Sequence, residues 1–203
     1  LRCGLGGAVL SLAVSRIAGQ WVFAATCLGL ACAWAYSAPP FRLKMSGIWG
    51  PGVVGLTYEG LTWFTGAAVM AGTLPGTEIL ITLLLYSIGA HGIMTLNDFK
   101  AVEGDQQMGV RSLPVMLGVD RASQIACVTM ALPQFIVVAL LAQWGHSVAA
   151  LIVAVLVMAQ LALMPRLLYD PRKNTPWYNA TGTTLYVFGM LAAAFGLGGA
   201  VGI

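Results

Sequence analysis

The sequence predicts an all-α protein, a polytopic bundle of helices that crosses a membrane. Hydrophobic residues make up 59% of its 203 residues and charged residues only 8%, whereas soluble domains are typically about 45–50% apolar and about 25% charged. The mean hydropathy is +0.85. The third observation is that long apolar runs recur along the chain, and a run of about 17–25 such residues can span a bilayer as a helix.

Seven such runs can be read, at residues 4–17, 20–37, 52–72, 79–98, 121–143, 147–164 and 181–202. The first run is short and starts close to Leu1, which is not Met and does not open a signal peptide. We therefore expect a chain that lacks its N-terminal helices. No linker divides the sequence, so residues 1–203 are expected to form a single membrane domain.

The basic residues predict how the bundle is oriented. Eight of the ten Lys and Arg residues fall in the connections that follow the second, fourth and sixth runs: Arg42, Lys44, Lys100, Arg111, Arg121, Arg166, Arg172 and Lys173. The positive-inside rule assigns these connections to the cytoplasm. The net charge of +3 is therefore a topology signal. Because no basic stripe alternates with aromatic residues, nucleic-acid binding is excluded. The four cysteines lack the spacing of a metal site or a disulfide framework.

Three acids gather where the fourth apolar run ends. Asp98, Glu103 and Asp105 lie within eight residues. If the helix continues to this point, residues 91, 98 and 105 recur every seven positions, and His91, Asp98 and Asp105 face one cavity. If Gly104 ends the helix earlier, Asp105 enters from a loop instead.

Carboxylates this close repel one another unless a cation neutralises them. Oxygen ligands suit Mg²⁺, which binds through one or two carboxylates together with substrate phosphates. Acids beside a basic loop therefore predict a site for a magnesium diphosphate. The alternative is that the acids form salt bridges with Lys100, Arg111 and Arg121 on a solvated helix at the membrane boundary.

The basic partner is the segment YSAPPFRLK. Pro39 and Pro40 disfavour helix, so we expect a stiff, extended segment that presents Arg42 and Lys44 to one anion. Arg42 can bind phosphate oxygens in a bidentate manner, Lys44 acts as a point charge, and Tyr36 adds a hydroxyl donor. The alternative is that both cations only anchor the chain at the membrane surface.

The segments YSAPPFRLK, LNDFKAVEGD and GVRSLPVMLG resemble the UbiA-type intramembrane prenyltransferases, most closely their chlorophyll and bacteriochlorophyll synthase branch. The resemblance implies nine transmembrane helices, of which about seven are present, around a cavity where two acidic motifs hold Mg²⁺ and an allylic diphosphate. The second motif matches Asn97, Asp98, Glu103 and Asp105. The first, NDxxDxxxD, does not occur in these 203 residues, and since it would supply half of the metal site, activity of this chain alone is not expected.

The resemblance also assigns roles. Many relatives carry an acid where Ala101 stands here, so the metal set should rest on Asp98 and Asp105, with Glu103 as a third ligand. The expected catalytic residues are Asp98, Asp105, Lys44 and Arg42, and the expected substrate-binding residues are Tyr36, Asn97, Arg111, Glu59 and His91.

Two of these residues carry alternatives. An acid inside a span is costly and usually functional, so Glu59 is expected to line the acceptor pocket or to pair with a basic residue. His91 either ligates the central metal of a tetrapyrrole or is a hydrogen-bonded packing histidine.

The expected activity is Mg-dependent esterification of the propionate of bacteriochlorophyllide with geranylgeranyl or phytyl diphosphate. The implied location is a bacterial inner membrane with the active face cytoplasmic. The implied partners are the isoprenoid diphosphate, the tetrapyrrole and the lipid bilayer, together with contacts to other pigment-synthesis or photosystem assembly proteins.

Other functions remain open at this stage. Within the same class the acceptor is chlorophyllide or an aromatic quinone precursor. A polytopic transporter would line its path with Glu59, His91 and Asp98, but it predicts inverted repeats and broken helices, which the sequence does not display. A pigment-binding scaffold would need no diphosphate loop.

Overall fold

The computed structural model describes residues 2–198, and regular structure within that range is helical. The elements are α1 (Arg2–Ala18), α2 (Gln20–Ser37), η1 (Leu43–Met45), α3 (Trp49–Gly55), η2 (Leu56–Leu61), α4 (Thr62–Ala71), α5 (Thr77–Asn97), η3 (Asp98–Lys100), α6 (Val102–Met108), α7 (Leu113–Leu117), α8 (Val119–Gln143), α9 (Ser147–Tyr169) and α10 (Pro171–Gly198). The all-α prediction is confirmed.

Helices lie at each of the seven predicted ranges, the last of them described as far as Gly198. Within the described residues, four helical segments are long and apolar enough to cross a membrane: Thr77–Lys100, Val119–Gln143, Ser147–Tyr169 and Pro171–Gly198. Of the other three, α1 has 17 residues and α2 has 18. The remaining one, predicted at residues 52–72, is a continuous helix in which the π-helical turn η2 separates α3 from α4. The chain is an integral membrane protein.

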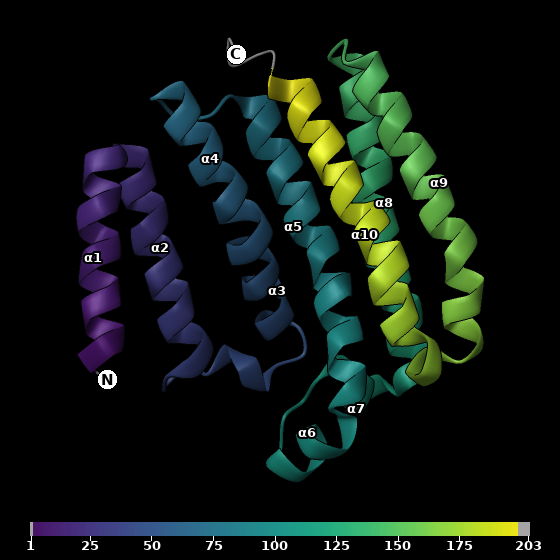
Figure 1. Cartoon of the computed structure of the whole chain (residues 1–203). Helices are drawn as coiled ribbons and strands as arrows, with labels where there is room; N and C mark the ends of the chain where they lie inside the picture. The colour runs from purple at the N-terminus through teal and green to yellow at the C-terminus, as the bar shows by residue number, and fades with distance from the viewer. Residues whose placement is uncertain (1, 199–203) are drawn as a thin grey trace.

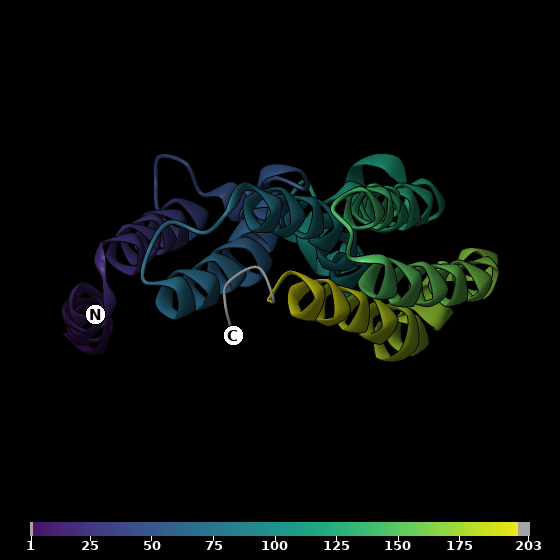
Figure 2. The ribbon, with the colours of Figure 1, turned by 90° about the horizontal axis from the view of Figure 1, so that it is seen from above.

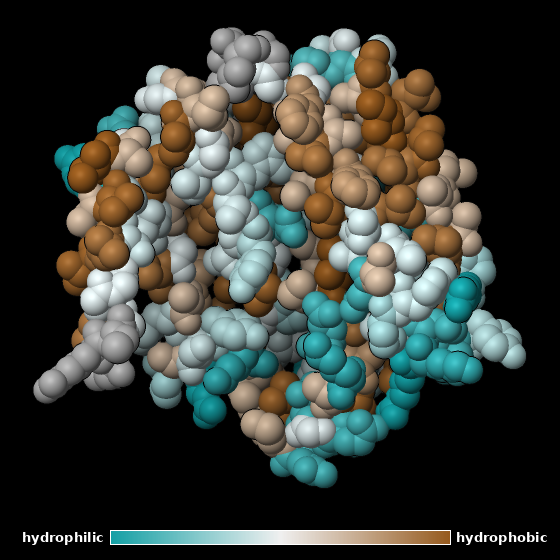
Figure 3. All heavy atoms as spheres, viewed as in Figure 1, coloured by the Kyte–Doolittle hydropathy of each residue, from teal (hydrophilic) through white to brown (hydrophobic). Residues whose placement is uncertain are grey.

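The helices run side by side and alternate in direction (Figure 1). The connections from α2 to α3, from α5 to α8 and from α9 to α10 therefore share one end of the bundle, as the pattern of basic residues predicts. Hydrophilic residues gather at this end, around α6 and the start of α10, whereas hydrophobic residues cover α9 above it (Figure 3). We call it the charged end.

The core lies among α5, α8, α9 and α10, which cluster on one side of the molecule, with α1 outermost on the other (Figure 2). The fully buried Tyr86, Met130, Val153 and Tyr186 belong to this core. Two buried amides connect its helices: Gln134 of α8 donates to Gln160 of α9 at 2.6 Å, and Gln160 donates to the carbonyl of Gly182 on α10 at 3.1 Å. Such bonds hold helices together where lipid gives no hydrophobic driving force.

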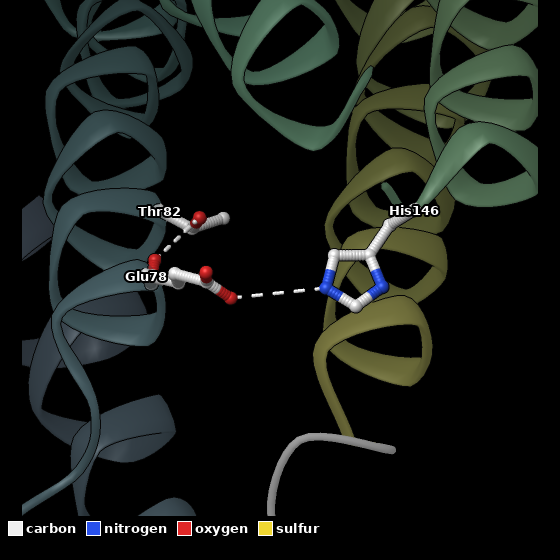
Figure 4. A network of polar contacts seen from close by, with 3 residues as sticks. All are labelled: Glu78, Thr82 and His146. Carbon is white, nitrogen blue, oxygen red and sulfur yellow. Dashed lines mark hydrogen bonds and ion pairs between the residues drawn. The ribbon is translucent and has the colours of Figure 1, made fainter. Parts of the chain in front are cut away.

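The end of the bundle opposite the charged end holds an ion pair. Glu78, in the first turn of α5, lies 3.7 Å from the imidazole of His146, which precedes α9, and Thr82 donates to the carbonyl of Glu78 (Figure 4). The contact joins α5 to the turn between α8 and α9. It contains no residue expected in the substrate site.

Helix α10 begins ten residues before the predicted range, at Pro171 rather than residue 181. Pro is favourable at the first helical position because the missing N–H has no partner there in any case. The carboxylate of Asp170 accepts from the N–H of Lys173 at 3.2 Å, which caps the helix. Hydropathy missed this start because the first turns, PRKNTP, are polar.

Candidate diphosphate site at the charged end

Backbone hydrogen bonds join the two charged loops. The N–H of Gly47 donates to the carbonyl of Arg111 at 2.7 Å, and the N–H of Arg111 donates to the carbonyl of Met45 at 3.0 Å. Ser46 and Arg111 form an isolated parallel bridge. The loop that follows α2 and the loop that precedes α7 are therefore held as one unit, although they lie far apart in the sequence.

Gly47 makes this approach possible. A Cβ at this position would lie 2.7 Å from the carbonyl oxygen of Arg111 and would also overlap the backbone N of Leu113. Both neighbours are backbone atoms, so neither can rotate away. Glycine is needed here because the two chains come closer than any side chain allows.

A cavity of about 970 Å³ lies above this junction. Its polar wall carries the side chains of both loops: Tyr36, Arg42, Lys44, Asn97, Asp98, Asp105 and Ser112. The cations and carboxylates that the sequence predicts to share a site thus line one chamber.

Another part of the cavity lining is apolar and includes small residues. Gly29, Cys32 and Ala33 recur on one face of α2, and Val53 and Val54 of α3 complete the wall. A ligand that fills the whole cavity would therefore combine a charged head with an apolar tail.

Asp98 and Asp105 reach the cavity from different elements. The helix does continue past Asn97, but as the 3-10 turn η3, and it breaks at Ala101, which has φ −113° and ψ 4°. A new helix, α6, then carries Asp105 and runs through Gly104 to end at Gly109, which has φ +70°. Neither alternative, a continuous helix or a loop that begins at Gly104, describes the segment. The chain breaks at Ala101, and both acids line the cavity from separate helical elements.

Ser112 orients one of these acids. Its hydroxyl donates to Oδ2 of Asp105 at 2.7 Å. Sequence reasoning did not select Ser112, although it lies in the quoted segment GVRSLP. A hydroxyl next to a basic residue gave no reason to expect this contact.

The basic loop is folded, not extended. Arg42 has φ 43° and ψ 51°, its N–H donates to the carbonyl of Ala38 at 3.0 Å, and its carbonyl accepts from the N–H of Met45 at 2.9 Å. These bonds close a turn around Pro39 and Pro40, so the expectation of an extended segment is wrong. The cations nevertheless line the same cavity, because the turn and η1 place residues 42 and 44 along it.

The donor set fits a divalent cation that is shared with a ligand. Within residues 2–198, the carboxylates in contact with a basic side chain are Glu78, with His146, and Glu103, with Arg172. Neither Asp98 nor Asp105 forms an ion pair with a described basic residue. The same range contains no group of three or more His, Cys, Asp or Glu residues that could hold a metal. Two carboxylates leave the remaining coordination to water and phosphate oxygens, as Mg²⁺ prefers.

Glu103 lies outside the cavity. Its carboxylate accepts from the guanidinium of Arg172 at 2.8 Å, and both side chains are more than half exposed. The hydrogen bond from its own backbone N–H, followed by that from Arg172, lowers the pKa of Glu103. The partner is thus a residue of α10 and not Lys100, Arg111 or Arg121, as the salt-bridge alternative supposed. Glu103 connects α6 to α10.

His91 does not share the cavity with Asp98. It lines a smaller groove of about 470 Å³ with Ser87, Thr129 and apolar residues. Its Nε2 lies 3.1 Å from the carbonyl of Ile48, and its Nδ1 lies 3.4 Å from the hydroxyl of Thr95. The contacts are those of a hydrogen-bonded packing histidine.

Two further predicted residues lie away from the cavity wall. Arg111 joins the loops through its backbone, and its side chain is exposed. Glu59 lies on the π-helical turn η2, half-buried, and neither lines the cavity nor forms an ion pair with another described residue.

Asn97 does line the cavity, and it has a partner on another helix. The Nδ2 of Asn179 on α10 donates to its Oδ1 at 3.1 Å. Asn179 was not selected from the sequence, because nothing in the spacing connects residues that lie 82 positions apart.

Similarity to known proteins identifies the family. The sequence profile of the UbiA prenyltransferase family matches residues 1–188. The chain belongs to that family. It is 58% identical over 191 residues to the bacteriochlorophyll synthase 33 kDa chain of Cereibacter sphaeroides. The aligned region covers 94% of this chain and 63% of that protein.

Two further relatives are less similar to this chain. The 34 kDa chain of bacteriochlorophyll synthase from Chloroflexus aurantiacus is 46% identical over 93% of this chain and 60% of its own length. The chloroplastic chlorophyll synthase of Avena sativa is 36% identical over 82% of this chain and 44% of its own length. The chain thus spans less than two thirds of the length of these curated relatives. No solved structure matches it at a significant level.

Proposed function

We propose that this chain takes part in prenyl transfer from an isoprenoid diphosphate, geranylgeranyl or phytyl, to the propionate carboxylate of bacteriochlorophyllide. Its high identity to two bacteriochlorophyll synthase chains supports this acceptor over chlorophyllide or a quinone precursor. Membership of the prenyltransferase family supports the reaction class.

One observation carries the proposal. Arg42 and Lys44 line the same cavity as Asp98 and Asp105, and residues of α2 and α3 add an apolar part to its lining. The charged wall suits a diphosphate, and the apolar wall suits the hydrocarbon chain attached to it. A scaffold that only held pigment would need neither cation.

In the proposed reaction, Arg42 and Lys44 bind the diphosphate oxygens and Tyr36 donates a hydrogen bond from α2. Asp98 and Asp105 hold Mg²⁺, the divalent ion proposed here. When bound, it neutralises the diphosphate charge and stabilises the departing pyrophosphate. Cations held in place beside the diphosphate stabilise the negative charge that develops on it in the transition state.

The chemistry then needs no general base. The allylic C–O bond breaks, and its electron pair leaves with the pyrophosphate. The propionate oxygen attacks the resulting allylic carbon and forms the ester. Because a carboxylate is already ionised near neutral pH, the protein has no proton to remove.

We further propose that the charged end faces the cytoplasm of a bacterial inner membrane. Eight of the ten Lys and Arg residues lie in its connections or in the adjoining helix ends, as the positive-inside rule requires. Water-soluble pyrophosphate would then leave on the cytoplasmic side.

The test uses membranes from cells that make the protein from its natural gene. Bacteriochlorophyllide is supplied with geranylgeranyl or phytyl diphosphate, with Mg²⁺ or with excess EDTA, and the esterified pigment is measured by chromatography. We expect ester only with Mg²⁺. If no ester forms in its presence, the proposal is wrong. If chlorophyllide is esterified at least as fast, the assigned acceptor is wrong.

A further inference from the structure

Asn179 contacts the cavity only through another residue. It lies on α10, is not part of the cavity wall, and donates from Nδ2 to Oδ1 of Asn97, which is part of that wall. The pair bridges α10 and the end of α5, directly before Asp98. Through this pair, α10 is connected to a residue of the cavity wall.

A planar amide has an acceptor oxygen on one side and an NH₂ donor on the other. Asn179 occupies one of the two lone pairs of Asn97 Oδ1 and fixes its direction. The NH₂ group of Asn97 has no hydrogen-bond partner in the described part of the chain, so it is available to a ligand. A neutral donor next to Asp98 suits a phosphate oxygen and does not suit a cation.

Asn179 depends on this contact in turn. Its Oδ1 is buried and has no hydrogen-bond partner in the described part of the chain. The bond to Asn97 is therefore the one polar contact found there for the Asn179 side chain. Since an unsatisfied buried polar group is costly, loss of this bond would leave the whole amide without a partner. The two asparagines are coupled.

We propose that Asn179 is a positioning residue that fixes the Asn97 amide so that its N–H groups donate to a diphosphate oxygen in the cavity. The inference rests on the proposed function, because it names how that site selects its anion. It gives α10 a part in substrate binding without any contact to the substrate.

The first test measures binding, not turnover. The protein purified in detergent is titrated with inorganic pyrophosphate and Mg²⁺ by calorimetry. Asn179→Leu removes the donor, and we expect the Kd for pyrophosphate to rise about tenfold, the size expected for a hydrogen bond to a charged group. The matched control is Asn174→Leu on the same helix, whose Nδ2 donates to the carbonyl of Arg166; its Kd should equal that of the parent.

Asn179→Asp tests the direction of the amide with almost no change of shape. A carboxylate can only accept, so Asn97 must turn and present Oδ1 to the cavity. We expect pyrophosphate binding to weaken at least as much as in Asn179→Leu. If Asn179→Asp binds as tightly as the parent or more tightly, Asn97 presents oxygen to the metal and the inference is wrong.

A double mutant separates positioning from a general effect on folding. In an Asn97→Ala background, Asn179→Leu should cause no further rise in Kd, because the group on which it acts is gone. An additional rise would overturn the inference, and so would a parent protein that does not bind pyrophosphate. Failure to form ester while pyrophosphate binding still depends on Asn179 would contradict the proposed function alone.

Discussion

At the scale of single residues, three neighbouring acids lie in three different environments. Asp98 lines the cavity from η3 without an ion-pair partner, Asp105 lines it with Ser112 as donor, and Glu103 points away to Arg172. They lie within eight residues of sequence, and composition alone does not distinguish them. The break at Ala101 separates Asp98 from α6, and on α6 the two-residue spacing of Glu103 and Asp105 directs their side chains to different faces.

Asp98→Asn should lower ester formation at least about tenfold at saturating Mg²⁺. Mutation of a residue that only hydrogen-bonds to a metal ligand already lowers metal affinity or activity about 10–100-fold, and Asp98 is proposed as a ligand. The apparent Mg²⁺ requirement should rise as well. Both are measured by titrating Mg²⁺ in the membrane assay. Glu103→Gln is the control, and it should leave turnover and Mg²⁺ dependence close to those of the parent because its side chain lies outside the cavity. Undiminished turnover in Asp98→Asn would remove Asp98 from the metal set.

At the scale of elements, the site depends on two loops that meet through their backbones. The two loops are far apart in the sequence, and both were predicted to lie on the same side of the membrane. The closest approach occurs at Gly47. Helix α10 adds a second connection from outside, through Asn179 and through Arg172.

Gly47→Ala should separate the loops, because the new methyl group would overlap backbone atoms of residues 111–113. We expect a loss of about 1–3 kcal/mol in unfolding free energy, as for other overpacked sites, together with weaker pyrophosphate binding. Thermal unfolding in detergent and calorimetry measure the two effects. Gly104→Ala is the control, since a Cβ there meets nothing within 4 Å and Ala favours helix. An unaltered Gly47→Ala protein would show that the loops do not need this contact.

At the scale of the whole molecule, the core and the site are separate parts of one bundle. The core is formed by α5, α8, α9 and α10 around the amides of Gln134 and Gln160. The cavity is formed by α2, α3, the end of α5 and the loops of the charged end. A substitution inside the core, away from the end of α5, should therefore change stability without changing substrate binding.

Gln160→Leu tests this separation. It removes the bonds to Gln134 and to Gly182, and we expect the unfolding free energy to fall by about 1 kcal/mol, within the range measured for such bonds in membrane bundles. The KM for the prenyl diphosphate should remain that of the parent. Gln143→Leu, at the exposed end of α8, is the matched control for stability. A change in KM would mean that core packing reaches the site.

The sequence by itself determined the helical class, the ranges of the apolar helices and the end at which charge collects, because these depend on local hydropathy and on charge next to each span. It also selected Arg42, Lys44, Asp98 and Asp105, since their types and spacing follow a chemical motif. The tertiary structure decided which of the candidates share the cavity. It separated His91 and Glu103 from Asp98 and joined Asn179 to Asn97 across 82 positions. The physical reason is that a side chain's direction depends on helix breaks and on contacts with distant elements, which no local pattern records.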